Sequence, residues 1–330
     1  MEFRPLLNAF VCADGVMAPV GMAWAQTPAQ AYPAKTIRIV VPYAAGGPAD
    51  SISRTIAQRL SDTWKQSVIV DNKPGASGMI GADIVAKAAP DGYTLLVINQ
   101  LLVQTPSLYS TVPYDPLRDL TPVTDLISSP LWLAVNSSNT TARTMKEFVD
   151  QAKARPGDYN YASVGTGSIG HLYGFRLNEA TGLNFTHVPY KGAAPVVMAL
   201  LSGEVTTAFV DYATLKPHLE SGKVRALAVS DTKRTQATPD VPTFTESGYK
   251  GFEASSWIGL FATAKTPPDV VQKLHAEVAR ILKQPDVIAK FQDGQGFQMG
   301  GQGQAQWTAQ VAADFDRWGV LIRKAGVKLD

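Results

Sequence analysis

The chain has 330 residues, of which 45% are hydrophobic and 18% are charged, and its formal net charge is +2. This length and apolar content are enough for one large or two medium globular domains. The balanced charge, with no long run of one sign, excludes the basic surface of a nucleic-acid-binding or membrane-surface protein. The four histidines make no metal-ligand spacing with one another or with the single cysteine, so neither a metal nor a cofactor is expected.

Residues 1–25 have the features of a secretory signal peptide. Arg4 precedes an apolar run that ends in an A-x-A-type cleavage site at 23–25, which predicts a mature chain starting near Gln26. Cleavage would remove Cys12, and a mature protein without cysteine suits an oxidising compartment. Because no later apolar run is long enough to span a bilayer, we expect a soluble, periplasmic protein.

The next elements alternate between strands and helices. Strands are predicted at 37–41, 67–70 and 93–98, and helices at 51–60 and 79–88, which together make a βαβαβ unit. Residues 105–126 are rich in Pro, Asp and Thr and are interpreted as a connection between domains.

A second α/β unit of similar size is predicted after this connection. Its strands are expected at 131–135, 160–163, 184–188, 206–210 and 224–229, and its helices at 144–154, 168–180, 194–202 and 215–221. Downstream of a polar stretch at 231–250, the pattern predicts a strand at 256–263 and long amphipathic helices at 270–283 and 304–324.

The first unit has too few helices to cover its sheet, so the C-terminal helices are expected to return to it. This predicts a discontinuous domain 1, formed by 26–126 and 253–330, and a domain 2 formed by 127–252. The chain would then cross between the domains near 127–135 and 251–262, which predicts a hinge and a cleft between two α/β lobes.

Two strand–turn–helix segments carry Gly- and Ala-rich turns, at 43–50 and 163–171. Ligands of open parallel sheets bind at the carboxyl ends of strands, and a helix N-terminus offers unpaired N–H groups to an anion. The two turns therefore predict a small acidic ligand held from both ends.

The second turn matches the dinucleotide-binding pattern G-x-G-x-x-G at Gly165–Gly170. That interpretation requires an acidic residue at the end of the next strand to hold a ribose, and LNFTHVPY contains none. The same backbone N–H groups, with the hydroxyls of Ser163, Thr166 and Ser168, can instead surround a carboxylate. The structural alternative is a Gly-rich turn in which Ser168 caps the helix.

Ser168, His171 and Asp211 could also be assembled into a hydrolase triad. Ser168 is not in a G-x-S-x-G elbow, so His171 is expected to be a partnered helix residue near the cleft. A Ser168- and His171-dependent hydrolase is kept as an alternative function.

Other candidates lie at strand ends. Asp50 is expected to be a helix N-cap rather than a ligand contact, and its charge disfavours a phosphate at this end. Asn99 and Gln100 could donate amide N–H groups to a carboxylate or cap the turn, and Lys191 could attract an acidic ligand or simply be solvated.

In the segments that contain these candidate residues, the sequence resembles the Bug family of extracytoplasmic solute receptors. These are the binding proteins of tripartite tricarboxylate transporters. The matching segments occur in family order from about Tyr32 onward: IRIVVPYAAGGPADSISR, DNKPGASGMIGADIVAKAAPDGYTLL, YNYASVGTGSIGHL, VPYKGAAP and SWIGLFA. The resemblance implies a two-domain periplasmic-binding-protein (Venus flytrap, type II) α/β fold, hinged by two crossing strands, with no catalytic activity and no cofactor. It also implies a carboxylate ligand, such as a di- or tricarboxylate or an aromatic acid, delivered to membrane transporter subunits.

Carried over by motif, the resemblance gives a set of expected ligand contacts. They are Tyr43, Ala44, Ala45, Gly47 and Asp50 in the first turn, Ser163, Gly165, Thr166, Gly167, Ser168 and His171 in the second, and Pro189, Tyr190, Lys191 and Asp211 beyond it. Pro48-Ala49 and Asn99-Gln100 depart from the family pattern and are expected to alter the ligand's variable end. A monomer is expected, no nucleic acid is involved, and a sensor protein remains an alternative partner to a transporter.

Overall fold

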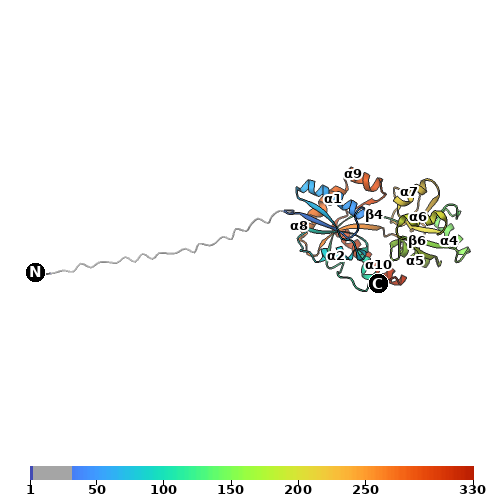
Figure 1. Cartoon of the computed structure of the whole chain (residues 1–330), viewed down its shortest axis with the longest axis horizontal. Coiled ribbons are helices and arrows are strands. Elements are labelled where there is room, and N and C mark those ends of the chain that lie inside the picture. Colours follow the sequence, from blue (N-terminus) through green and yellow to red (C-terminus); the bar gives the residue numbers. More distant parts are fainter. Residues whose placement is uncertain (3–31) are drawn as a thin grey trace. The chain divides into compact units, whose positions relative to one another are not determined.

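The computed structural model describes residues 1–2 and 32–330, and residues 33–330 form one compact unit (Figure 1). The predicted signal peptide, with its cleavage site at 23–25 and Cys12, lies outside the described residues apart from the first two. Within the described part, no helix has the length and apolar character needed to cross a membrane.

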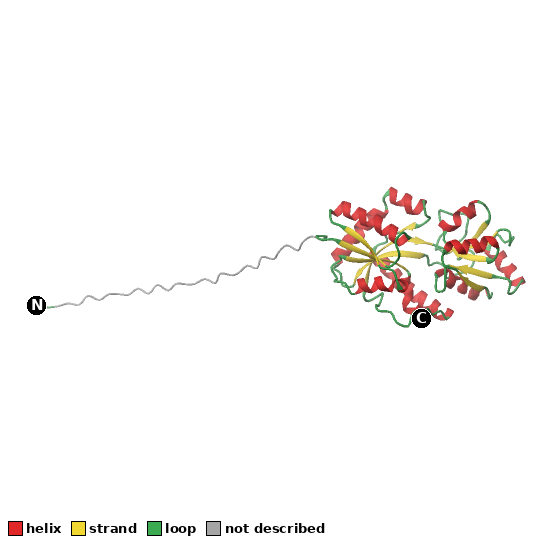
Figure 2. Cartoon of the chain, in the orientation of Figure 1, coloured by secondary structure: helices red, strands yellow, loops and turns green. Residues whose placement is uncertain are grey.

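The strands of this unit form two sheets (Figure 2). The first has six strands in the order β11–β4–β10–β3–β1–β2: β1 (Ile37–Val41), β2 (Val68–Asn72), β3 (Thr94–Asn99), β4 (Leu120–Ser129), β10 (Ser256–Thr263) and β11 (Gln298–Met299). β1 pairs in parallel with β2 and β3, whereas β10 runs antiparallel to β3 and β4. Strands β1 and β3 are nearly continuous apolar runs, as expected where helices cover both faces of a sheet.

The helices of this sheet come from both ends of the chain. They are α1 (Pro48–Trp64), α2 (Met79–Ala86), α3 (Leu101–Leu108), α8 (Pro268–Leu282), the short α9 (Pro285–Ile288) and α10 (Gln304–Ala325). A 3-10 turn at Ala76–Gly78 and a π-helical turn at Ala289–Asp293 complete them. The apolar face of α8 is buried, and α8 and α10 both pack on β4. The predicted return of the C-terminal helices is therefore confirmed.

The second sheet has five strands in the order β7–β6–β8–β5–β9. They are β5 (Trp132–Asn136), β6 (Asn160–Ser163), β7 (Thr186–Pro189), β8 (Thr207–Val210) and β9 (Val224–Val229). Its helices are α4 (Met145–Ala154), α5 (Ile169–Thr181), α6 (Ala193–Ser202) and α7 (Tyr212–Glu220). We call this sheet with its helices the second half of the unit, and the six-stranded sheet with its helices the first half.

The interpretation of residues 105–126 as a connection is wrong. This stretch contains the last part of α3 and most of β4, a strand that lies between β11 and β10 in the first sheet. The prediction missed these elements because each contains a proline. Pro106 leaves the Leu102 carbonyl without its helical donor, and the Thr105 hydroxyl donates to that carbonyl instead, at 3.4 Å. Pro122 pairs with Phe261 beside a register shift in the ladder, where a missing N–H is tolerated.

Two chain crossings and a helix–helix contact are among the connections between the halves. The chain passes from β4 to β5 through Pro130 and Leu131, and returns from β9 to β10 along 230–255. In addition, α10 packs against α5, where the rings of Trp318 and Tyr173 lie 5.8 Å apart. The domain boundaries at 126/127 and 252/253 stay a prediction.

Candidate functional site

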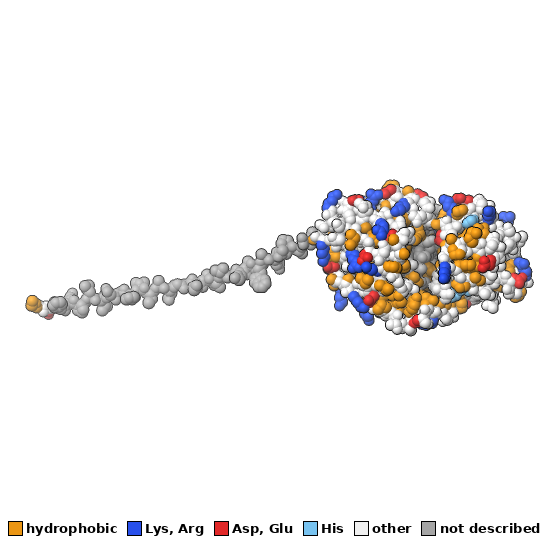
Figure 3. Space-filling view, in the orientation of Figure 1, with side chains coloured by type: hydrophobic (Ala, Val, Ile, Leu, Met, Phe, Trp, Pro, Cys, Tyr) orange, Lys and Arg blue, Asp and Glu red, His pale blue; other side chains and the backbone are white. Residues whose placement is uncertain are grey.

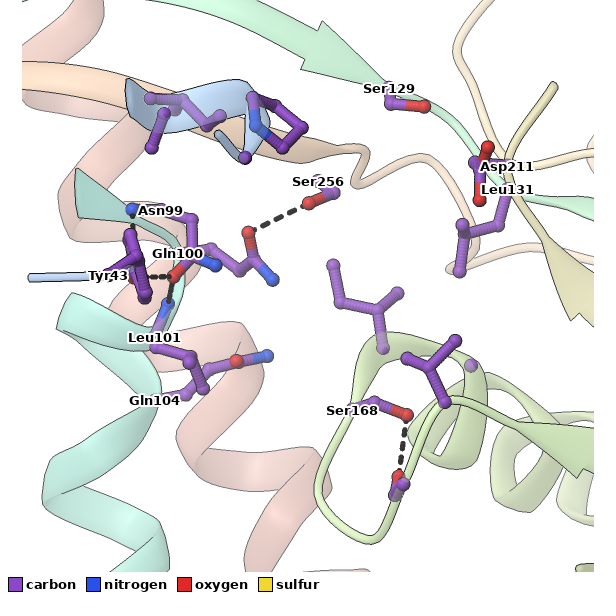
Figure 4. A pocket seen from close by; sticks show the side chains of 18 of the residues that line it. Tyr43, Asn99, Gln100, Leu101, Gln104, Ser129, Leu131, Ser168, Asp211 and Ser256 are labelled. Carbon is purple, nitrogen blue, oxygen red and sulfur yellow. Dashed lines mark hydrogen bonds between the residues drawn. The ribbon is translucent and has the colours of Figure 1, made fainter. Parts of the chain in front are cut away.

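A cavity of about 740 Å³ lies between the two halves, at the carboxyl ends of their parallel strands. Its lining from the first half includes the turns after β1 and β3 and parts of β4 and β10, and its lining from the second half includes 164–170 and 209–214. Figure 3 shows a furrow between the halves on the face in view, and Figure 4 shows the cavity wall from close by. The volume is typical of a small-molecule site.

The structure brings ten of the expected contact residues to this cavity. They are Tyr43, Gly47, Asp50, Asn99, Gln100, Gly165, Thr166, Gly167, Ser168 and Asp211. The others lie outside its lining: Ala44, Ala45, Pro189 and Lys191 are exposed, Ser163 is buried beneath the second turn, and His171 and Tyr190 are partly buried. The role of all these residues in ligand contact stays a prediction.

The prediction that Asp50 is an N-cap is wrong. Gly47 occupies the cap and Pro48 begins α1, so Asp50 is the third helical residue. Its carboxylate accepts hydrogen bonds from the Gly46 N–H at 2.9 Å, from Arg54 Nε at 3.0 Å and from Asn72 Nδ2 at 3.0 Å. The hydrogen bond from Arg54 is the main reason why the pKa of Asp50 is lowered to about 2. The Asp50 carboxylate is therefore ionised, and its three hydrogen-bond donors are provided by the protein itself.

Tyr43 and Asn99 join the two turns of the first half. The Tyr43 hydroxyl donates to Asn99 Oδ1 at 2.6 Å, and the same oxygen accepts from the Leu101 N–H at 3.0 Å. Asn99 thus fulfils the turn-capping alternative at the start of α3. Burial raises the pKa of Tyr43, so its phenol stays neutral.

The second turn is held by its own hydrogen bonds. The Ser168 side chain accepts from the His171 N–H at 3.3 Å, which caps α5, and its hydroxyl donates to the Gly165 carbonyl at 2.7 Å. Gly165 and Gly167 have φ angles of +136° and +81°, which other residues rarely adopt. The capping alternative for Ser168 is therefore confirmed, and the glycines have a conformational role.

A stacked histidine pair lies under this turn. The rings of His171 and His187 are 3.9 Å apart, His171 Nδ1 accepts from the Gly167 N–H at 3.1 Å, and His187 Nε2 is 2.7 Å from Ser163 Oγ. Burial lowers the pKa of both histidines, that of His187 to about 4, so both rings are neutral near pH 7. The expectation that His171 is a partnered helix residue is confirmed. A Ser168- and His171-dependent hydrolase would require a hydrogen bond between the His171 ring and the Ser168 hydroxyl. In the structure, His171 Nδ1 instead accepts from the Gly167 backbone N–H.

The electrostatics of the cavity come from backbone dipoles rather than from cationic side chains. Among the described residues that line it, Asp50 and Asp211 are the ones with a formal charge, and none is Lys, Arg or His. Asp211 caps α7 by accepting from the Thr214 N–H at 3.0 Å. The helices α1, α3, α5 and α7 all begin at the lining. Their N-termini carry partial positive charge and suit an anion.

Several lining residues escaped the sequence reasoning. Among them are Gln104 on α3, Ser129 at the end of β4, Ser256 at the start of β10, and Leu329. Gln104 was not considered because α3 was not predicted. No pattern in the sequence marks the other three.

The chain matches a family model and several known proteins. The model described as "Tripartite tricarboxylate transporter family receptor" matches residues 52–327. Protein BugT of Bordetella pertussis is 34% identical over 326 residues, covering 98% of this chain and 97% of BugT. A protein from R. palustris solved with adipate is 34% identical, with a TM-score of 0.73, and covers 90% of this chain and 100% of its own.

A second solved structure is also similar. MatC from Rhodopseudomonas palustris, with bound malate, is 32% identical, with a TM-score of 0.69 over 88% of this chain and 100% of MatC. These similarities confirm the predicted α/β periplasmic-binding-protein fold and extend over both halves of the unit. This chain therefore belongs to the tripartite tricarboxylate transporter family of receptors, which are periplasmic binding proteins and not enzymes.

Proposed function

We propose that this protein captures a small carboxylate between its two halves and delivers it to the membrane subunits of a tripartite tricarboxylate-type transporter. The observation that carries this proposal is the cavity at the N-termini of α1, α3, α5 and α7, lined by both halves. Backbone N–H groups and hydroxyls in such a site can bind a carboxylate without a cationic side chain. Two similar structures hold the carboxylates adipate and malate.

Capture would involve closure of domain 1 (26–126 and 253–330) on domain 2 (127–252) about the crossings near Pro130 and 230–255. A monomer exported through its N-terminal signal and closing in this way would present one surface to the transporter when liganded. A micromolar dissociation constant, about −8 kcal/mol, is within reach of several charge-assisted hydrogen bonds. A sensor protein as recipient is the second candidate, and genes for transporter membrane subunits next to this one would favour the transporter.

A ligand panel on the mature protein tests this function. We expect at least one member of a set of mono-, di-, tri- and aromatic carboxylates to raise the melting temperature. A ligand at a hundred times its dissociation constant adds about 2.7 kcal/mol to the free energy of unfolding, which corresponds to about 5 °C. The same ligand should reduce the radius of gyration in X-ray scattering. The methyl esters are the controls, and a panel with no stabilising member at millimolar concentration would contradict the proposal.

A further inference from the structure

The cavity contains a buried amide without a partner. The Gln104 side chain has an exposed fraction of 0%, and neither its Nε2 nor its Oε1 has a hydrogen-bond partner among the described residues. Figure 4 shows this side chain extending from α3 on the same side of the cavity as Gln100. A buried polar group without a partner is unfavourable and uncommon in folded proteins. The hydrogen-bonding capacity of this amide is therefore unused at the edge of the cavity.

A second amide faces the same space. Gln100 is 7% exposed, and its Oε1 accepts from the Ser256 hydroxyl at 2.9 Å, which fixes the orientation of the side chain. This bond leaves the Nε2 of Gln100 as a donor on the cavity wall. Gln100 and Gln104 therefore present donors and one free acceptor, but no charge, at the end of the cavity formed by the first half.

A second ligand carboxylate at this end could use the N-termini of α1 and α3, but it would share this end of the cavity with the ionised Asp50. The Gly46 N–H already donates to Asp50, Pro48 has no N–H, and the ionised Asp50 carboxylate lies in the same turn. A carboxylate also cannot donate to the free Oε1 of Gln104, and two acceptors facing each other repel. The second turn differs, because Thr166, Ser168 and the start of α5 line the cavity without an acidic side chain at 164–170. Asp211 caps α7 elsewhere in the second half, so the ligand's charged end is best placed against the second turn itself, at the start of α5.

We propose, building on the carboxylate-binding function, that Gln104 and Gln100 select ligands whose far end is an uncharged group that both donates and accepts, above all a primary carboxamide. A carboxamide can form two reciprocal N–H···O bonds with the Gln104 amide, and its oxygen can accept from Gln100 Nε2 as well. The preferred substrate class is therefore the monoamides of dicarboxylic acids and similar ω-carbamoyl carboxylates. Gln104 is a specificity-determining residue in this assignment.

Matched ligands test the assignment by calorimetry on the mature protein. The sets are adipate, its monoamide and hexanoate, and succinate, its monoamide and butyrate, each titrated into the wild type. At the chain length that fits, the monoamide is expected to bind at least about tenfold more tightly than the dicarboxylate and the monocarboxylate, as two added hydrogen bonds require.

Gln104→Met keeps the size of the side chain and removes its hydrogen bonds. This variant is expected to lose the preference for the monoamide, so that its dissociation constants for the monoamide and for hexanoate or butyrate become similar. It should also melt at a higher temperature than the wild type without ligand, because the unpaired amide is gone. Gln58→Met, on an exposed surface of α1 where the amide donates to Asp62, is the control that should change neither property.

The outcomes separate two failures. Dicarboxylates that bind at least as tightly as their monoamides, or a preference that survives Gln104→Met, would overturn the role assigned to Gln104 and leave carboxylate binding intact. If no ligand in either set binds, and none of the wider carboxylate panel does, the carboxylate-binding function itself fails.

Discussion

At the scale of single residues, Asp50 is the side chain that organises the first turn. It connects the Gly46 N–H, Arg54 and Asn72, and so holds the turn, α1 and β2 together. Its side chain is only 5% exposed, so these hydrogen bonds to a charged group are well shielded from water.

Asp50→Asn is expected to lower the free energy of unfolding at pH 7 by about 1–2 kcal/mol, because the charge-assisted bonds weaken. The pKa of Asp50 is about 2 in the folded protein, below its ordinary value of 3.8. Its contribution is therefore complete above pH 4 and is lost as the pH falls toward 2. Urea unfolding at several pH values should show the difference between wild type and variant shrinking in that window. The exposed Asp62→Asn on the same helix is the control, and an equal loss in that variant would refute the assignment.

The sequence predicted the turns of the site better than it predicted the roles of individual polar side chains. The two turns could be recognised because Gly46, Gly165 and Gly167 adopt positive φ angles that favour glycine. The position of Asp50 within its helix was missed because Pro48 shifts the helix start. The isolation of the Gln104 amide could not be predicted, since it depends on which atoms every neighbouring element brings to that point.

At the scale of elements, the segment from β6 to α5 rests on the stacked histidines. His187 contacts Ser163 at the end of β6, and His171 holds the Gly167 N–H. The ring of Tyr161 also stacks on His187, at 5.0 Å. Protonation of either histidine would place a charge in this partly buried stack and disturb the turn that lines the cavity.

Stability is expected to fall as the pH decreases from about 6.5 to about 4. The pKa of His187 is lowered to about 4 by burial, so the unfolded chain binds this proton more readily than the folded one. His187→Asn should flatten the dependence of the melting temperature on pH within this window, whatever its effect on stability at pH 7. Gln58→Met, at an exposed position of α1, should leave the slope unchanged. A slope that His187→Asn does not alter would show that other groups are responsible.

The element prediction failed where proline was taken as a sign of a connection. Strand β4 tolerates Pro122 because the ladder shifts register there, and α3 tolerates Pro106 because a threonine hydroxyl replaces one backbone donor. The register shift and the threonine hydrogen bond depend on strand pairing and on side-chain geometry. Neither can be predicted from the amino-acid composition of the segment. Elsewhere the alternation of strands and helices was strong enough to be read directly, as in β1, β6, β9 and β10.

At the scale of the whole folded unit, the halves are connected by more than the two chain crossings. Besides the packing of Trp318 on Tyr173, Lys324 of α10 lies 3.6 Å from Glu179 of α5, and the Tyr173 hydroxyl donates to the Ala254 carbonyl on the return segment. Closure would have to pivot about this buried contact. The two-sheet plan could be predicted from the two successive α/β patterns, and the return of the C-terminal helices from the shortage of helices in the first unit. The contact of α10 with α5 could not be predicted, because an amphipathic pattern shows which face of a helix is buried but not which element covers that face.

The rate of ligand association is expected to depend little on ionic strength. The net charge is only +2, and no cationic side chain is found in the described cavity lining to attract an anion from a distance. Stopped-flow association rates should change by less than about threefold between about 20 and about 500 mM salt. Ser129→Lys, which adds a cation to the lining, should bind faster at low salt and become salt-sensitive. A strong salt dependence in the wild type would indicate electrostatic steering from elsewhere on the surface.

The proposed recognition of the anion by main-chain groups would also affect how such a receptor can evolve. Every residue except proline has a backbone N–H, whatever its side chain. Point mutations at the start of α5 would therefore leave the proposed anion-binding donors in place. The opposite wall is made of side chains, and single codon changes at Gln100 or Gln104 alter what it accepts. A duplicated copy of the gene could acquire a new ligand through a few substitutions there, without losing its hold on the carboxylate during the transition.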